Sequence, residues 1–318
     1  MSVRTSAIGP QDVLDARERL EGVAVRTPVL QSAALDDAIG ATILCKAENR
    51  QVTGSFKIRG AYNCASRFPE DQLEHGLIAI SSGNHAQAVA KSAQLLGTSA
   101  VIAMPDDSSE LKRNATQALG ATVIGFDRFA RDREDVLREL LADSKRCFVP
   151  PYDHPHVMAG QGTAALELFE DADDIDVLVV PISGGGLMAG CGTIAKDRNA
   201  NLRLIGVEPD AADDTKRSLE TGERIWIEAP VTIADGLRTQ IPGELTFEIN
   251  RRLVDEVVLV TDDEIRDAMD LLRSSLGEIV EPSGAVAVAA LLAGHVQAAH
   301  ARVGVILSGG NIESRLAT

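Results

Sequence analysis

A lysine at the start of an expected helix is the first residue of this 318-residue chain whose position suggests chemistry. Lys57 lies in the stretch 55–61, which follows a polar turn at 52–54 and leads into a helical pattern. The positive end of a helix dipole favours the neutral form of an amine at such a position. A neutral amine is the form that Schiff-base chemistry requires. A single lysine is more often a surface residue, so this interpretation depends on its neighbours.

Glycine-rich turns follow three of the apolar runs that we expect to be strands. They are Ser81-Ser82-Gly83-Asn84, Ser183-Gly184-Gly185-Gly186 and Ser308-Gly309-Gly310-Asn311. In open α/β sheets, ligands bind beyond the carboxyl ends of strands, where N–H groups at helix N-termini attract anions. Three such turns favour a ligand with two anionic groups, such as a phosphate and a carboxylate. None of them matches the glycine pattern of a dinucleotide site or a P-loop.

Two further polar segments could each be either a turn or a metal-binding site. The acidic run 208–214 follows an expected strand, where such runs are usually solvated turns. His154 and His156 form an H-x-H pair, but Pro151 and Pro155 bound their loop and favour turn structure over a metal site.

The elements that must position these residues alternate between short apolar runs and longer helical patterns. This alternation predicts an α/β protein with mainly parallel sheets. The expected strands span residues 42–46, 77–80, 100–104, 122–125, 177–182, 202–207, 256–260 and 303–307. The expected helices include residues 84–96, 109–119, 132–143, 187–195 and 263–276. Thr261 and Glu264 have the spacing of a capping box at the start of the last helix.

Composition excludes several classes of protein. Hydrophobic residues make up 45% and charged residues 25%, as in globular proteins, and 318 residues favour two lobes over one. The net charge of −16 argues against nucleic-acid and anionic-membrane partners, and 3% aromatic residues argue against single-stranded nucleic acid.

The sequence also argues against a membrane-spanning or a secreted protein. The uncharged stretch 177–195 is long enough for a membrane span, but Pro181 and five glycines favour a strand, a turn and a helix. The four cysteines are far apart, which favours free thiols. No secretory leader is recognised, so we expect a cytoplasmic protein.

Together, these motifs resemble the pyridoxal-phosphate (PLP) enzymes of the tryptophan-synthase β fold, and within them the threonine dehydratase and serine racemase branch. The resemblance rests on residues 55–61, 81–87, 183–187 and 308–311, with support from 150–155, 159–163 and 233–236. It extends from about Arg26 to Asn311 and implies PLP fold type II, with two lobes that are each a mainly parallel open sheet flanked by helices. Residues 1–71 and 149–318 would form the large PLP-binding lobe, and 72–148 a small mobile lobe.

The resemblance also implies a role for each motif. Lys57 would hold PLP through its amine and then act as the catalytic base, with Ser82 as a second base on the opposite face. The cofactor-binding residues would be Phe56, Lys57, Asn84, Ser183, Gly184, Gly185, Gly186, Leu187 and Ser308. The substrate-binding residues would be Ser81, Ser82, Gly83, Asn84 and His85. Ser183 replaces the first glycine of the usual four, and the neutral hydroxyl of Ser308 makes a weaker electron sink, which favours elimination.

The acidic run matches the family's divalent-cation site. The implied ligands are the carboxylates of Glu208 and Asp214 and the backbone carbonyl of Ala212, for Mg²⁺ or else Ca²⁺ or Mn²⁺. Glu281 would lie near the cofactor or simply begin a helix, and Arg238 would face a carboxylate on the substrate side chain.

The implied activity is a PLP-dependent L-threonine or L-serine dehydratase that releases a 2-oxo acid and ammonia by β-elimination. Serine racemase and 3-hydroxyaspartate dehydratase share nearly all of these motifs and stay open as alternatives. A β-replacement synthase, a non-enzymatic PLP carrier and a nucleotide-binding protein are rivals of other classes. The family resemblance implies a homodimer whose small-molecule partner is a hydroxy amino acid.

Overall fold

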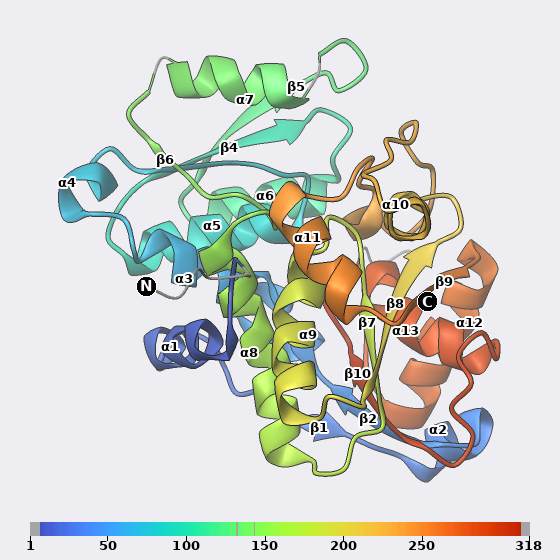
Figure 1. Ribbon diagram of the computed structural model, residues 1–318. Coiled ribbons are helices and arrows are strands. Elements are labelled where there is room, and N and C mark those ends of the chain that lie inside the picture. The colour runs from blue at the N-terminus through green and yellow to red at the C-terminus, as the bar shows by residue number, and fades with distance from the viewer. Residues whose placement is uncertain (1–6, 132, 143, 313–318) are drawn as a thin grey trace.

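The structure, a computed structural model, describes residues 7–131, 133–142 and 144–312. The strands in these residues form two separate sheets, which lie in the upper and lower parts of Figure 1. They are β1 (Val29–Leu30), β2 (Thr42–Lys46), β3 (Leu77–Ile80), β4 (Ala100–Pro105), β5 (Thr122–Phe126), β6 (Cys147–Phe148), β7 (Val177–Pro181), β8 (Arg203–Pro209), β9 (Glu256–Val260) and β10 (Arg302–Ile306).

The larger sheet has six strands in the order β1-β2-β10-β7-β8-β9, and only the β1–β2 pair is antiparallel. The smaller sheet has the order β5-β4-β3-β6 and is parallel throughout. Its strands lie within residues 72–148, the segment that we expected to form the smaller lobe. β3 and β7 are buried along their whole length, as expected for parallel strands that helices cover on both faces.

Helices cover both sheets. The α-helices are α1 (Pro10–Leu20), α2 (Ala33–Ile39), α3 (Lys57–Ala65), α4 (Glu70–Leu73), α5 (Asn84–Leu95), α6 (Glu110–Ala118), α7 (Arg133–Ala142), α8 (Pro155–Asp171), α9 (Gly186–Arg198), α10 (Asp214–Thr221), α11 (Glu244–Leu253), α12 (Asp262–Leu276) and α13 (Pro282–Leu292). Short 3₁₀ turns are η1 (Glu48–Arg50), η2 (Val52–Gly54) and η3 (Asp235–Leu237).

The predicted α/β architecture with mainly parallel sheets is confirmed. β2, β3 and β9 have the predicted bounds, and the other predicted strands differ by one or two residues at one or both ends. The capping box of α12 is present, with Thr261 and Glu264 bonded to each other's backbone N–H groups. α9 extends three residues beyond its predicted end, because a polar last turn at the surface carries no apolar signal. For the helix predicted at 132–143, Asp132 and Asp143 lie outside the described residues.

The longest helix, α8, was not predicted. The loop interpretation of its start was wrong, because Pro155 occupies the first helical turn, where no N–H is needed, and His154 is the N-cap. Gly160 and Gly162 weakened the helical pattern, yet each allows close packing of another backbone. A Cβ at Gly162 would lie 2.7 Å from the carbonyl oxygen of Gly190 in α9, and one at Gly160 would overlap the carbonyl of Arg59 in α3.

A buried ion-pair cluster lies beneath α3. The guanidinium of Arg59, which is 1% exposed, binds both the carboxylate of Glu48 (Nε–Oε2 2.7 Å) and that of Glu167 (Nη1–Oε1 2.7 Å). The fully buried ammonium of Lys46 also pairs with Glu167, at 2.7 Å. The cluster fastens α3 to β2, η1 and α8, and so fixes the helix that carries Lys57.

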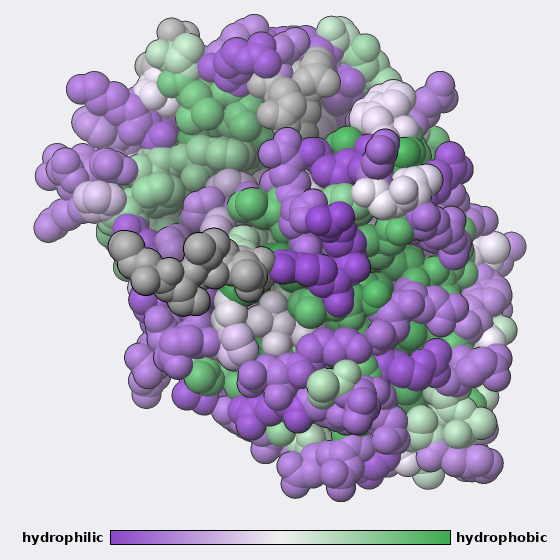
Figure 2. Space-filling view, viewed as in Figure 1, coloured by the Kyte–Doolittle hydropathy of each residue, from purple (hydrophilic) through white to green (hydrophobic). Residues whose placement is uncertain are grey.

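Hydrophilic side chains predominate on the face shown in Figure 2. Among the residues that the structure describes, no helix is both long and apolar enough to cross a membrane. The uncharged stretch 177–195 is β7, a turn and most of α9, as the sequence indicated.

Candidate active site

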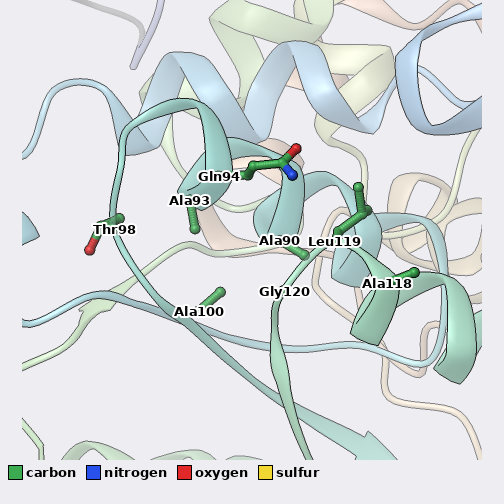
Figure 3. A pocket seen from close by; sticks show the side chains of 8 residues that line it. All are labelled: Ala90, Ala93, Gln94, Thr98, Ala100, Ala118, Leu119 and Gly120. Carbon is green, nitrogen blue, oxygen red and sulfur yellow. The ribbon is translucent and has the colours of Figure 1, made fainter.

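A cavity of about 690 Å³ lies between the two sheets, and the turns after β3, β7 and β10 all line it. Every residue predicted to bind cofactor or substrate is in its lining: Phe56, Lys57, Ser81, Ser82, Gly83, Asn84, His85, Ser183, Gly184, Gly185, Gly186, Leu187 and Ser308. A smaller cavity of about 280 Å³ lies against α5 and α6 (Figure 3). None of the described residues that line the smaller cavity is titratable, so the chemistry belongs to the larger one.

Lys57 is the first residue of α3, with Phe56 as the N-cap. Its Nζ donates a hydrogen bond to the carbonyl of Pro151 at 2.9 Å and lies 5.1 Å from the centre of the Phe56 ring. The backbone N–H of Phe56 donates to the carbonyl of Ser308 at 3.1 Å. This bond joins the start of α3 to the turn after β10, so the lysine has a defined position in the cavity.

Asn311 connects the turn that precedes Lys57 with the turn that follows β3. Its Nδ2 donates to the carbonyl of Thr53 and to Oδ1 of Asn84, each at 2.8 Å. Thr53 and Gly54 both have positive φ, 65° and 72°, and a side chain at Gly54 would overlap the Asn311 amide. The turn 308–311 therefore lines the cavity and also fixes the positions of the turn before Lys57 and of the turn after β3.

Asn84 has a fixed amide orientation as a consequence. Because its Oδ1 accepts from Asn311, its Nδ2 faces Glu281 and donates to Oε1 at 2.5 Å. An amide nitrogen carries two hydrogens, so Asn84 can donate one more hydrogen bond to an acceptor in the cavity, as the predicted contact with a phenolic oxygen requires. Burial raises the pKa of Glu281 to about 7. Glu281 is both the N-cap of α13 and a residue of the cavity lining, so its start-of-helix position is confirmed and its place near the cofactor stays a prediction.

The turn 183–186 joins β7 to α9, and side chains of α10 and α11 bind three of its successive carbonyls. The pairs are Thr215 Oγ1 with Ser183 O (3.0 Å), Thr246 Oγ1 with Gly184 O (2.6 Å) and Asn250 Nδ2 with Gly185 O (3.1 Å). Because these carbonyls face α10 and α11, the N–H groups at the start of α9 are left to bind an anion. The hydroxyl of Ser183, which departs from the usual glycine, is hydrogen-bonded to that of Thr239. The arrangement fits a phosphate group.

Tyr152 is a cavity residue that sequence reasoning missed. A Cβ at Gly184 would lie 2.5 Å from three atoms of the Tyr152 ring, so the ring lies directly against the turn. The next residue, Asp153, accepts hydrogen bonds from the first backbone N–H groups of α11. The sequence offered one signal for Tyr152 as a site residue: it follows two prolines, and the chain has only two tyrosines.

Lys112 is the second missed residue. It comes from α6, is 8% exposed, and forms an ion pair with Asp235 of η3 across the cavity. A Cβ at Gly83 would lie 3.4 Å from the Lys112 Nζ, which places the ammonium against the turn 81–85. Arg238, predicted to face a substrate carboxylate, lines the cavity, but its Nε donates to the carbonyl of Thr232 at 3.0 Å. Lys112 is the more deeply buried cation.

The predicted cation ligands lie outside this cavity, where β8 meets α10. Glu208 and Asp214 are 0% exposed and Ala212 is 1% exposed. Neither carboxylate oxygen of Asp214 has a hydrogen-bond partner among the described residues. Burial and the neighbouring Asp214 raise the pKa of Glu208, and burial raises that of Asp214 to about 8. Two buried carboxylates side by side are costly without a cation, so the residues fit a divalent ion.

No richer metal site is found in the described part of the chain, where no group of three or more His, Cys, Asp and Glu side chains converges. An ion at Glu208 and Asp214 would therefore need the Ala212 carbonyl and water as further ligands, which suits Mg²⁺. The Nδ1 of His154 accepts a hydrogen bond from the backbone N–H of His156, so His154 caps α8. The cysteines are Cys45, Cys64, Cys147 and Cys191, all buried and free.

Comparisons with known proteins agree with this geometry. Residues 20–309 match the family described as "Pyridoxal-phosphate dependent enzyme". An L-threo-3-hydroxyaspartate ammonia-lyase from Pseudomonas sp is 45% identical over 302 residues, covering 95% of each chain. A serine racemase from Schizosaccharomyces pombe is 42% identical, covering 95% of this chain and 94% of the other. An L-threonine ammonia-lyase from Thermotoga maritima is 39% identical, covering 95% and 75%.

The fold comparison leads to the same group. The structure of maize serine racemase superposes with a TM-score of 0.94 at 36% identity, covering 98% of this chain and 96% of that one. The first two relatives bear the names of the alternative activities, not of the threonine or serine dehydratase first expected. The chain belongs to the fold-type II pyridoxal-phosphate-dependent enzymes, in the group that contains the ammonia-lyases and serine racemases.

Proposed function

We propose that this enzyme is an ammonia-lyase for β-hydroxy amino acids that prefers L-threo-3-hydroxyaspartate. The observation that carries the proposal is the buried ammonium of Lys112, which lies against Gly83 in the turn predicted to bind the substrate carboxylate. The ammonium pairs with Asp235 and has three N–H donors, so a carboxylate on the substrate side chain can gain a further charge-assisted hydrogen bond there. The side chains of threonine and serine carry no charge. The hydroxyaspartate lyase among the relatives supports the same choice. L-Threonine and L-serine, the substrates first expected, become secondary.

The protein groups divide the reaction between them. When bound, PLP supplies the electron sink that stabilises negative charge at the substrate Cα. Lys57 Nζ takes the Cα proton as general base. N–H groups of the turn 81–85 bind the α-carboxylate, and Lys112 holds the β-carboxylate. The Cβ hydroxyl leaves with a proton as water, and the released enamine then takes up water to give a 2-oxo acid and ammonia.

The test is release of 2-oxo acid from L-threo-3-hydroxyaspartate, L-serine and L-threonine by the PLP-loaded protein. We expect the highest kcat/KM for hydroxyaspartate. Lys112→Gln should lower that value by at least about tenfold, as expected for a lost charged contact, and the value for L-serine by much less. An equal loss for both substrates would show that Lys112 does not recognise the side-chain carboxylate.

Serine racemisation is the second candidate. Lys57 and Ser82 line the same cavity, and one of the relatives is a serine racemase. Two bases on opposite faces of the substrate would exchange the Cα proton from either side. Formation of D-serine from L-serine, lost in Ser82→Ala while elimination persists, would support this activity.

We also propose that Glu208, Asp214 and the Ala212 carbonyl hold Mg²⁺ as a structural and activating ion. The buried carboxylate of Asp214, for which the described part of the chain offers no hydrogen-bond partner, supports this site. Chelation should lower the melting temperature, and Mg²⁺ should restore it, with Ca²⁺ and Mn²⁺ compared in parallel. A homodimer and a cytoplasmic location remain predictions from the family, testable by light scattering and by fractionation.

A further inference from the structure

The first turn of α10 contacts two sites that the mechanism treats separately. Thr215 is 1% exposed and follows the candidate cation ligand Asp214. Its backbone N–H donates to Oε1 of Glu208 at 3.2 Å, and its hydroxyl donates to the carbonyl of Ser183 at 3.0 Å. One residue therefore touches a carboxylate of the cation site and a carbonyl of the phosphate-binding turn.

We infer that Thr215 is a positioning residue through which Mg²⁺ at Glu208 and Asp214 strengthens the binding of PLP by the turn 183–186. The inference rests on the proposed cation site and not on the proposed substrate. Its geometry is a continuous chain of contacts from β8 through the start of α10 to the turn after β7.

The physical reason is electrostatic. Without a cation, the carboxylate of Asp214 has no hydrogen-bond partner among the described residues, so this side chain does not fasten the start of α10 to β8. A shared ion draws both carboxylates together and fixes the backbone at Thr215. The Thr215 hydroxyl then holds the Ser183 carbonyl, so the N–H groups of the turn are already oriented when the phosphate arrives.

The neighbouring anchors of the turn provide a matched control. Thr246 and Asn250 bind the carbonyls of Gly184 and Gly185 from α11, and neither has a hydrogen bond to Glu208 or Asp214. Loss of the Thr246 hydroxyl should therefore weaken the turn without breaking its connection to the cation site.

The experiment titrates PLP into apoenzyme, with Mg²⁺ or with chelator, and follows the visible absorbance of the bound form. In the natural protein, Mg²⁺ should lower the dissociation constant of PLP about tenfold, a typical coupling between sites. Thr215→Ser should keep this ratio. Thr215→Val should reduce it to below about twofold while Mg²⁺ still raises the melting temperature. Thr246→Val should weaken PLP binding under both conditions and keep the ratio.

By linkage, PLP should tighten Mg²⁺ binding by the same factor, which calorimetry measures.

Two results with the variants, and one with the natural protein, would overturn the inference. The variant results are a Thr215→Val protein that keeps the full ratio and a Thr246→Val protein that loses the ratio to the extent expected of Thr215→Val. If Mg²⁺ raises the melting temperature of the natural protein but leaves its PLP affinity unchanged, the cation site stands and the connection through Thr215 is refuted. No substrate is present, so failure of the proposed substrate cannot produce any of these results.

Discussion

The side-chain amide of Asn84 donates a hydrogen bond to the buried carboxyl group of Glu281, with 2.5 Å between Nδ2 and Oε1. The bond joins the start of α5 to the start of α13, so it connects the smaller sheet's helices with the larger sheet's helices inside the cavity. Glu281 is 2% exposed, and its Oε2 has no hydrogen-bond partner among the described residues. The stability of the folded protein should therefore depend on whether this carboxyl group is protonated.

Glu281→Gln should change how stability depends on pH. Burial raises the pKa of Glu281 from 4.5 to about 7, so the folded protein binds more protons than the unfolded chain between these values. The natural protein should lose up to about 3 kcal/mol of stability as the pH rises through this window, whereas the variant lacks that loss. Urea unfolding at pH 5, 6.5 and 8 measures the difference.

Glu278→Gln is the matched control. Burial opposes ionisation of Glu278, but hydrogen bonds from Arg50 and Asn49 outweigh it and lower the pKa. Its contribution is therefore present above the ordinary value and is lost only in acid, so this variant should shift stability nearly equally at all three pH values. The same slope in Glu281→Gln and the natural protein would mean that Glu281 is not the titrating group.

Gly184→Ala should weaken PLP binding, because a Cβ at this position would meet the ring of Tyr152 at 2.5 Å. The ring or the turn must move, and we expect the dissociation constant of PLP to rise at least about tenfold, equivalent to about 1.4 kcal/mol. Tyr152→Ala in the same chain should restore part of the affinity by making room. Gly9→Ala is the control, since its nearest neighbour is 3.9 Å away. Full PLP affinity in Gly184→Ala would refute the steric argument.

Lys57→Ala should abolish 2-oxo acid release while the protein stays folded. Lys57 is the amine in the cavity that the mechanism uses as base, and removal of a general base typically costs about 10²- to 10⁴-fold in rate. Lys145→Ala, at an exposed lysine shortly before β6, should leave the rate unchanged. Circular dichroism and melting temperature establish that both variants fold. Residual turnover within tenfold of the natural enzyme would assign the base elsewhere.

Much of the site could be predicted because parallel strands deliver their carboxyl ends to one edge. The turns at Ser183 and Ser308 follow β7 and β10, neighbouring strands of the larger sheet, so their meeting in one cavity follows from topology. The turn at Ser81 follows β3 of the smaller sheet, and its place in the same cavity depends on how the two sheets pack. The pairing of Lys112 with Asp235 could not be predicted, since it joins residues 123 positions apart, on α6 and η3. In the sequence Lys112 resembles any lysine of a surface helix, and only the packing of α6 over the cavity buries it.

α8 and Tyr152 were missed for a different reason, which is that close packing removes the local signal. Gly160 and Gly162 are poor helix formers in isolation, but backbone contacts with α3 and α9 leave no room for side chains there. The Tyr152 ring lies where a side chain at position 184 would be, so only glycine fits there. In both cases a glycine in one segment is explained by an atom in another, which a single sequence does not reveal.

Arg59→Met should cost about 3–5 kcal/mol of stability, because it leaves the buried carboxylate of Glu48 without its paired cation and removes one of the two cations paired with Glu167. The guanidinium binds Glu48 and Glu167, which are 0% and 7% exposed. Arg138→Met removes an exposed pair with Asp135 and should cost no more than about 0.5 kcal/mol. Urea unfolding measures the loss in free energy of unfolding for each variant. Equal losses would show that burial of the cluster does not increase its contribution to stability. Because Arg59 lies two residues after Lys57 on α3, the same variant should also lower kcat, and Arg59→Lys, which keeps the charge, should recover part of both losses.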